Sequence, residues 1–171
     1  MGIEKMSFLN YLINGLSLGS VYAIIALGYT MVYGIAKMLN FAHGDIIMVG
    51  AYVVFLCMKN AGLSPIVSII IAMIACTILG VVIEKVAYKP LRNVSSSLAV
   101  LITAIGVSYL LQNLATYITG GLARPYPEIS FLKKSFAVGS LNIKIITLLT
   151  PVLTILLVIS LVIFILSLIH I

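Results

Sequence analysis

Long, nearly uninterrupted apolar runs constrain this chain more than any other feature of its sequence. A helix of about 20 apolar residues crosses the hydrocarbon core of a bilayer, and five stretches reach or approach that length. They cover residues 8–33, 39–58, 65–83, 98–118 and 147–169. In lipid the backbone must satisfy its own hydrogen bonds, as a continuous helix does. The runs therefore predict an all-α, polytopic integral membrane protein with about five transmembrane helices.

The charge content supports this prediction. Only 8% of the 171 residues are charged and 63% are hydrophobic, whereas soluble domains carry about a quarter charged residues. The net charge of +6 comes from Lys and Arg that lie mostly between the apolar runs, where they meet lipid head groups. We expect membrane lipid as a partner and no nucleic acid.

The segment LNFAHGDIIM, from Leu39 to Met48, places polar residues between apolar runs. His43 and Asp45 raise the question of a catalytic pair or a metal site. Two positions apart on a helix they point about 200° apart, so they can meet only if Gly44 breaks the helix. A metal site needs at least three convergent ligands and a covalent catalyst needs an activated nucleophile, and the sequence identifies neither. We expect no enzyme, no metal and no cofactor.

The same segment can instead begin a helix. Asp45 directly precedes an apolar run, so its carboxylate can accept hydrogen bonds from the first free N–H groups and suit the helix dipole. Asn40 can end or interrupt the preceding segment in the same way. The pattern predicts a broken or re-entrant segment near residues 34–45, which is typical of transporters. The candidate pathway or helix-break residues are Asn40, His43, Gly44 and Asp45.

The first apolar run carries a stripe of small residues. Gly15, Gly19 and Ala23 are four apart, so they share one helix face. Small residues on one face let another helix approach closely. The stripe therefore predicts helix packing.

Three amides inside the apolar runs are the candidate intramembrane polar residues: Asn14, Gln112 and Asn113. Polar side chains in a span normally face protein or water rather than lipid. Two interpretations remain open, namely hydrogen bonding between helices and the lining of an aqueous path.

A basic connection is expected between the third and fourth runs. It extends from Glu84 to Ser97 and contains Lys85, Lys89 and Arg92. Short cytoplasmic loops are enriched in Lys and Arg, so we place this connection on the cytoplasmic side.

Three stretches, in order, resemble a known family. They are NGLSLGSVYAIIALGYTMVYGIAKMLNFAHGD, EKVAYKPLR and LAVLITAIGVSYLLQN, within residues 14–113. They are closely similar to the permease subunits of bacterial branched-chain amino acid ABC transporters of the leucine/isoleucine/valine type. The resemblance implies a multi-pass protein of the bacterial inner membrane that imports these amino acids. It also implies a second permease subunit, cytoplasmic ATP-binding subunits and an extracytoplasmic amino-acid-binding protein as partners.

Family members are longer, with about three more spans. The resemblance therefore implies that residues 1–171 are the N-terminal part of a longer permease domain, truncated after about the fifth span. The alternative function is a stand-alone channel or secondary carrier for small polar solutes, because broken helices and intramembrane amides fit such proteins equally well.

Overall fold

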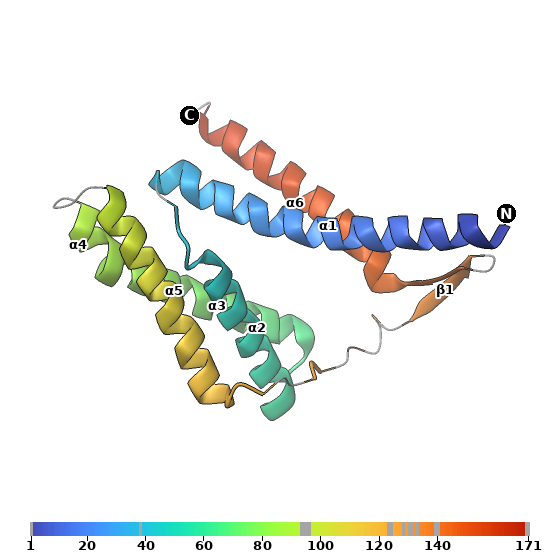
Figure 1. The fold of residues 1–171 in the computed structure, drawn as a ribbon, viewed down its shortest axis with the longest axis horizontal. Coiled ribbons are helices and arrows are strands. Elements are labelled where there is room, and N and C mark those ends of the chain that lie inside the picture. Colours follow the sequence, from blue (N-terminus) through green and yellow to red (C-terminus); the bar gives the residue numbers. More distant parts are fainter. Residues whose placement is uncertain are drawn as a thin grey trace. The chain divides into compact units, whose positions relative to one another are not determined.

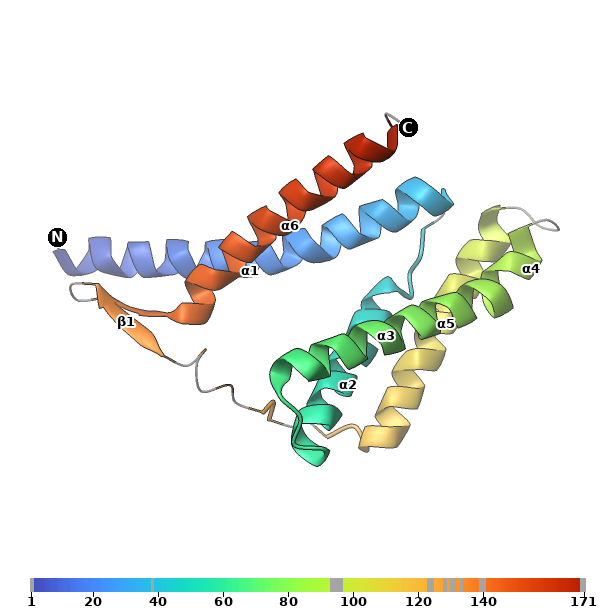
Figure 2. The same cartoon turned by 180° about the vertical axis from the view of Figure 1, so that it is seen from behind.

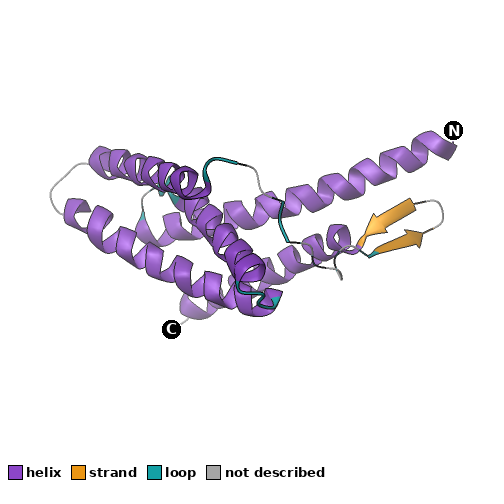
Figure 3. Cartoon of the chain, turned by 90° about the horizontal axis from the view of Figure 1, so that it is seen from below, coloured by secondary structure: helices purple, strands orange, loops and turns teal. Residues whose placement is uncertain are grey.

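The elements of the chain are almost all helical (Figures 1 and 3). The computed structural model describes residues 2–37, 39–92, 97–122, 125–127, 129, 132, 134–138 and 141–169. In chain order the elements are α1 (Gly2–Ala36), α2 (His43–Asn60), α3 (Pro65–Ile83), the π-helix η1 (Glu84–Tyr88), α4 (Lys89–Arg92), α5 (Ser97–Thr119), β1 (Ser135–Val138), β2 (Leu141–Lys144) and α6 (Ile145–Ile169).

Four helical stretches in the described part of the chain are long and apolar enough to cross a membrane. They are Phe8–Gly34, Pro65–Leu91, Leu98–Thr119 and Ile145–Ile165. Their large apolar side chains are widely exposed, which suits lipid surroundings. The prediction of an all-α polytopic membrane protein is confirmed. Helix α2 has 18 residues, including Asp45 and Lys59, and is not among the four, so its crossing stays a prediction.

Two helices have bounds that differ from those of the expected spans. The second helix begins at His43 rather than at residue 39, because the segment after α1 is not helical. The connection expected from Glu84 onward is helical as far as Arg92. Its residues include good helix formers such as lysine and leucine, so the helix outlasts the apolar run. The π-helix ends at Tyr88, two residues before Pro90, which has no N–H to donate.

A short antiparallel hairpin precedes α6 and was not expected. Strands β1 and β2 pair Ser135 with Lys144 and Val138 with Leu141. The sequence Val-Gly-Ser-Leu was the available signal, because Gly followed by a small polar residue favours two-residue hairpins. The Ile145 N–H donates to the Lys134 carbonyl at 3.0 Å, so α6 starts directly from the hairpin.

The chain forms two compact units, Met1–Thr30 with Glu128–Ile171, and Met31–Pro127. In the first unit α6 crosses α1 (Figures 1 and 2). The buried Thr154 hydroxyl donates to the Ser20 carbonyl there at 3.3 Å. In the second unit α2 packs chiefly against α3 and also against α5.

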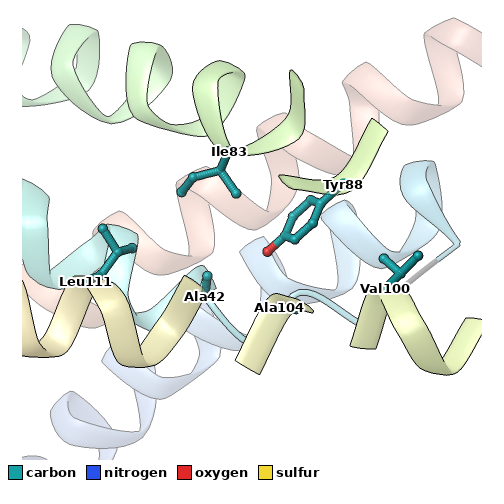
Figure 4. Close-up of a cluster of buried hydrophobic side chains, with 6 residues drawn as sticks. All are labelled: Ala42, Ile83, Tyr88, Val100, Ala104 and Leu111. Carbon is teal, nitrogen blue, oxygen red and sulfur yellow. The ribbon is translucent and has the colours of Figure 1, made fainter. Parts of the chain in front are cut away.

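The core of the second unit lies where the segment before α2 meets η1 and α5 (Figure 4). Its buried side chains are Ala42, Ile83, Tyr88, Val100, Ala104 and Leu111. Ala42 and Ala104 are fully buried. This core fixes the position at which α2 begins, and with it the polar residues described next.

Candidate functional site

The segment between α1 and α2 is the break that the sequence predicts. Helix α1 ends at Ala36, and Lys37 adopts a positive φ of 55°, a conformation that non-glycine residues rarely take. The Lys37 N–H still donates to the Tyr33 carbonyl at 2.8 Å. The chain then resumes as helix at His43. The expected broken segment near residues 34–45 is confirmed, because Lys37 and residues 39–42 are not helical.

Asn40 organises this break. Its Oδ1 accepts the Ala42 N–H at 3.1 Å, which is a local turn of the kind that asparagine favours. The same oxygen accepts the Tyr88 hydroxyl at 2.8 Å, and Tyr88 is buried. The Asn40 carbonyl accepts the His43 N–H at 3.2 Å. One side chain therefore shapes the turn and joins it to η1.

Asp45 does not cap α2, and the capping prediction is wrong. The N-cap position belongs to Ala42, so Asp45 lies inside the first turn. Its carboxylate is buried, with 8% of the residue exposed, and it faces α5. There Oδ2 accepts the Ser108 hydroxyl at 2.5 Å and Oδ1 accepts the Gln112 amide at 3.0 Å. The charge near the helix N-terminus still suits the dipole.

Ser108 and Gln112 complete a closed polar cluster with Asp45. Gln112 Nε2 also donates to Ser108 Oγ at 3.1 Å, one turn away on α5. A buried carboxylate is costly unless donors satisfy it, and here two donors do. Gln112 was expected to be an intramembrane polar residue, and its amide joins α5 to α2 through the hydrogen bond to Asp45. Ser108 was missed, although its spacing of four from Gln112 was a signal.

His43 and Gly44 do not join this cluster. Both belong to α2, so Gly44 does not break the helix and His43 stays on a different face from Asp45. Nothing lies within 4 Å of the position that a Cβ on Gly44 would take. Among the described residues no group of three His, Cys, Asp or Glu side chains could hold a metal ion.

The two other candidate amides lie apart from the Asp45 cluster. Asn113 is exposed, and its Nδ2 donates to the Tyr109 carbonyl of its own helix at 2.7 Å. Asn14 is exposed on α1 and lines a small cavity with Asn10 and Thr147 at the start of α6.

The glycine stripe is open in this chain. Gly15, Gly19 and Ala23 are exposed, and a Cβ on either glycine would meet nothing within 4 Å. The contact between α1 and α6 uses Ser20 and Thr154 instead. Packing along the stripe therefore stays a prediction about a partner.

The basic residues of the expected connection lie on helical turns. Lys85 is in η1 and Lys89 begins α4, and both are exposed. Arg92 ends α4, and its side chain lies outside the described part, as do residues 93–96. Tyr88, between the lysines, points into the core (Figure 4).

Residues 11–168 match the family described as the permease component of branched-chain amino acid transport systems. The chain is 46% identical over 118 residues to the high-affinity branched-chain amino acid transport system permease protein BraD of Pseudomonas aeruginosa, which covers 64% of this chain and 38% of BraD. It is 42% identical to LivH of Salmonella typhimurium and 40% identical to LivH of Escherichia coli, each over 137 residues. Both comparisons cover 75% of this chain and 44% of LivH.

The chain thus spans less than half the length of these curated relatives. No solved structure matches it.

Proposed function

The chain belongs to the family of permease components of branched-chain amino acid transport systems, and from that premise we propose that it is the membrane-embedded subunit of an ATP-driven importer for leucine, isoleucine and valine. The observation that carries this proposal is the family match over residues 11–168. The chain is a transport subunit and not an enzyme. ATP hydrolysis belongs to a partner protein.

The proposed location is the bacterial inner membrane. The chain is a multi-pass membrane protein. The exposed Lys85 and Lys89 lie near the C-terminal end of the apolar helical stretch Pro65–Leu91. Because cytoplasmic ends of short connections are rich in Lys and Arg, we place this end, with Arg92, in the cytoplasm.

The proposed partners are a second permease subunit, cytoplasmic ATP-binding subunits and an extracytoplasmic amino-acid-binding protein. The open face of Gly15, Gly19 and Ala23 on α1 supports a neighbouring helix, because small residues let two backbones come close. We assign this face to the second permease subunit.

The polar residues near the break are proposed to hold the helices that move during transport. The Asp45 cluster fastens the first turn of α2 to α5. The hydrogen bond from Tyr88 to Asn40 fastens the break to η1. Irregular backbone at membrane depth is typical of transport proteins, and π-turns are frequent at functional sites. Both features favour a segment that rearranges.

The alternative is a stand-alone channel or secondary carrier for small polar solutes. The break between α1 and α2 and the exposed Gln112 fit such a protein too. The two functions differ in one requirement, because a carrier moves solute without an ATP-binding subunit.

Co-purification tests the proposal. The protein carries an affinity tag in its own cells, and the solubilised complex is analysed by mass spectrometry. An ATP-binding subunit should appear in near-stoichiometric amount, and an unrelated polytopic protein with the same tag should not retain it. A tagged protein that is pure, folded and free of any ATP-binding subunit would favour the carrier.

A further inference from the structure

Two neighbouring cavities, one apolar and one mixed polar and apolar, lie in the unit formed by residues 31–127. The first has a volume of about 300 Å³ and lies among α2, α3 and α5. The second has a volume of about 440 Å³ and lies between α2 and the C-terminal turns of α5. Tyr52, Ala115 and Thr119 line both, so the cavities are neighbours. Ligand sites in proteins commonly measure about 300–1,000 Å³.

The first cavity is suited to an aliphatic group. Its walls are almost entirely apolar and include Val53, Leu56, Leu114 and Ile118. Removing apolar surface from water is favourable by about 0.8 kcal/mol for each buried CH₂ group. A branched aliphatic side chain is therefore a fitting occupant.

The second cavity presents hydrogen-bond acceptors. Gln112 lines it, and the two N–H groups of its amide are directed to the Asp45 carboxylate and Ser108. An ionised carboxylate only accepts, so the amide nitrogen must face Asp45. Among the described residues no hydrogen bond reaches the amide oxygen Oε1, so this oxygen is the acceptor that Gln112 can offer to a ligand in the cavity. The Thr116 hydroxyl donates to the Gln112 carbonyl at 2.8 Å, so its lone pairs also remain available.

The electrostatic surroundings of this cavity favour a cation. The carboxylate of Asp45 lies directly behind the Gln112 amide, and it is buried, where charges act more strongly than in water. The cavity also lies at the C-terminal end of α5, which ends at Thr119. A helix C-terminus carries the negative end of the dipole and unpaired carbonyl groups. An ammonium group is complementary to both features.

From these observations we infer that the paired cavities form a binding site for a branched-chain amino acid. The aliphatic side chain occupies the apolar cavity, and the ammonium group binds at Gln112 Oε1 with the Asp45 charge behind it. This inference rests on the proposed function, since it assigns a place in this subunit to the same substrate class. Asp45 and Ser108 act as positioning residues, because they orient the Gln112 amide without touching the ligand.

Equilibrium binding of radiolabelled leucine to the purified 171-residue chain in nanodiscs tests the site. Gln112→Met keeps the side-chain length and removes the acceptor, so affinity should fall about tenfold or more. Leu114→Trp fills the apolar cavity and should also weaken binding about tenfold. The matched control is Asn113→Leu, which changes an exposed amide next to Gln112 that lines neither cavity. Its affinity should stay within about twofold, a free-energy change below 0.5 kcal/mol.

Competition with fragments of leucine separates the two ends of the site. Isoamylamine keeps the ammonium and the branched side chain, so it should displace leucine. Isocaproic acid keeps the carboxylate and the side chain but lacks the ammonium, and should displace leucine at least about tenfold less well. The reverse order of the two fragments would overturn the inference.

Further outcomes also overturn it. Leucine binding that survives both Gln112→Met and Leu114→Trp, in variants that remain folded by circular dichroism, would place the ligand elsewhere. Phospholipid that copurifies in the apolar cavity, is lost in Leu114→Trp and is not displaced by leucine would assign that cavity to an acyl chain.

Uptake by the assembled transport system distinguishes a failure of the proposed site from a failure of the proposed function. If the wild-type assembly takes up leucine and the two variants do so equally well, the site is wrong and the function stands. If the wild-type assembly takes up no leucine while its chain binds leucine at this site, the proposed function fails and the site stands.

Discussion

At the scale of single residues, the carboxylate of Asp45 decides how α2 meets α5. It is buried, and both of its oxygens accept hydrogen bonds from α5. Removing this acceptor leaves the half-buried Ser108 hydroxyl and the exposed Gln112 amide without it, and a donor that loses its partner away from water costs more than the net value of the hydrogen bond. The cluster is therefore a sensitive point of the fold.

Replacing Asp45 separates hydrogen bonding from charge. Asp45→Ala leaves Ser108 and Gln112 without their acceptor and should lower the free energy of unfolding by about 1–3 kcal/mol. Asp45→Asn keeps one acceptor oxygen, and its new amide can donate to Ser108 Oγ, so the loss should be smaller. Thermal unfolding in detergent, followed by circular dichroism, measures both. Asn113→Ala is the control on α5, and Asp45→Ala unfolding at the wild-type temperature would contradict the account.

Gly50 is a second residue on which packing depends. A Cβ there would lie 2.9 Å from Cys76 Sγ on α3, so Gly50→Ala should destabilise the α2–α3 contact by about 1–3 kcal/mol. The double variant Gly50→Ala, Cys76→Ala removes the sulfur and should recover much of this loss. Gly44→Ala, on the same helix but with open space around it, should be neutral or stabilise by up to about 1 kcal/mol. Equal unfolding temperatures for Gly50→Ala and Gly44→Ala would rule out the close approach.

At the scale of elements, the break between α1 and α2 is held from the side by η1. The Tyr88 hydroxyl reaches Asn40 Oδ1, and the Tyr88 ring belongs to the core formed with Val100 and Ala104. Through Tyr88, η1 thus contributes both an aromatic ring to the core and a hydrogen bond to the break. The two irregular elements of this unit stabilise each other.

Tyr88→Phe tests that connection. The ring stays in the core while the hydrogen bond is lost, so the free energy of unfolding should fall by about 0.5–1.5 kcal/mol. Proteolysis or hydrogen exchange should show faster opening of the segment from Leu39 to Ala42. Tyr117→Phe, at a residue that is 87% exposed, is the control. Identical exchange in wild type and Tyr88→Phe would mean that the bond does not hold the break.

The elements were largely predictable from the apolar runs. Residues 65–83 and 98–118 correspond closely to α3 and α5, because long apolar runs leave a membrane chain few alternatives to helix. The extension of the third helix to Arg92 was missed, since helix propensity continues beyond the apolar residues. The short hairpin was missed because two strands of four residues leave a weak pattern.

The sequence predicted some residues of the candidate site but not which of them are in contact. The sequence singled out Asp45 and Gln112 as polar groups in apolar surroundings, yet they lie 67 positions apart. No local pattern shows that two such residues meet, because the contact depends on how α2 packs against α5. The capping role expected of Asp45 failed for the same reason. A carboxylate near a helix start can accept hydrogen bonds from the free N–H groups of its own helix or from side chains of a neighbouring helix. Here it accepts them from Ser108 and Gln112 on α5.

At the scale of the whole molecule, apolar surface dominates both units. Many of the largest exposed side chains are Ile, Leu, Val and Phe of α1, α3, α5 and α6. Surfaces of this kind need lipid or partner subunits. The open glycine face of α1 is the part of this surface with the shape for another helix.

Enlarging that face should disturb assembly but not the chain itself. A Cβ at Gly19 would meet nothing within 4 Å, and leucine is a better helix former than glycine, so the unfolding temperature of Gly19→Leu should be unchanged or slightly higher. Co-purification of the second permease subunit should fall, because the larger side chain keeps the helices apart. Leu18→Ile, at an exposed neighbouring position, is the control. Normal assembly of Gly19→Leu would show that the face is directed to lipid.

We propose that this subunit moves branched-chain amino acids only as part of an ATP-driven system. Uptake of radiolabelled leucine into proteoliposomes tests it most directly, with the chain alone and with its second permease, ATP-binding and amino-acid-binding partners. We expect ATP-dependent uptake by the assembly and only background uptake by the chain alone. Leucine uptake by the chain alone, without ATP or any partner, would contradict it.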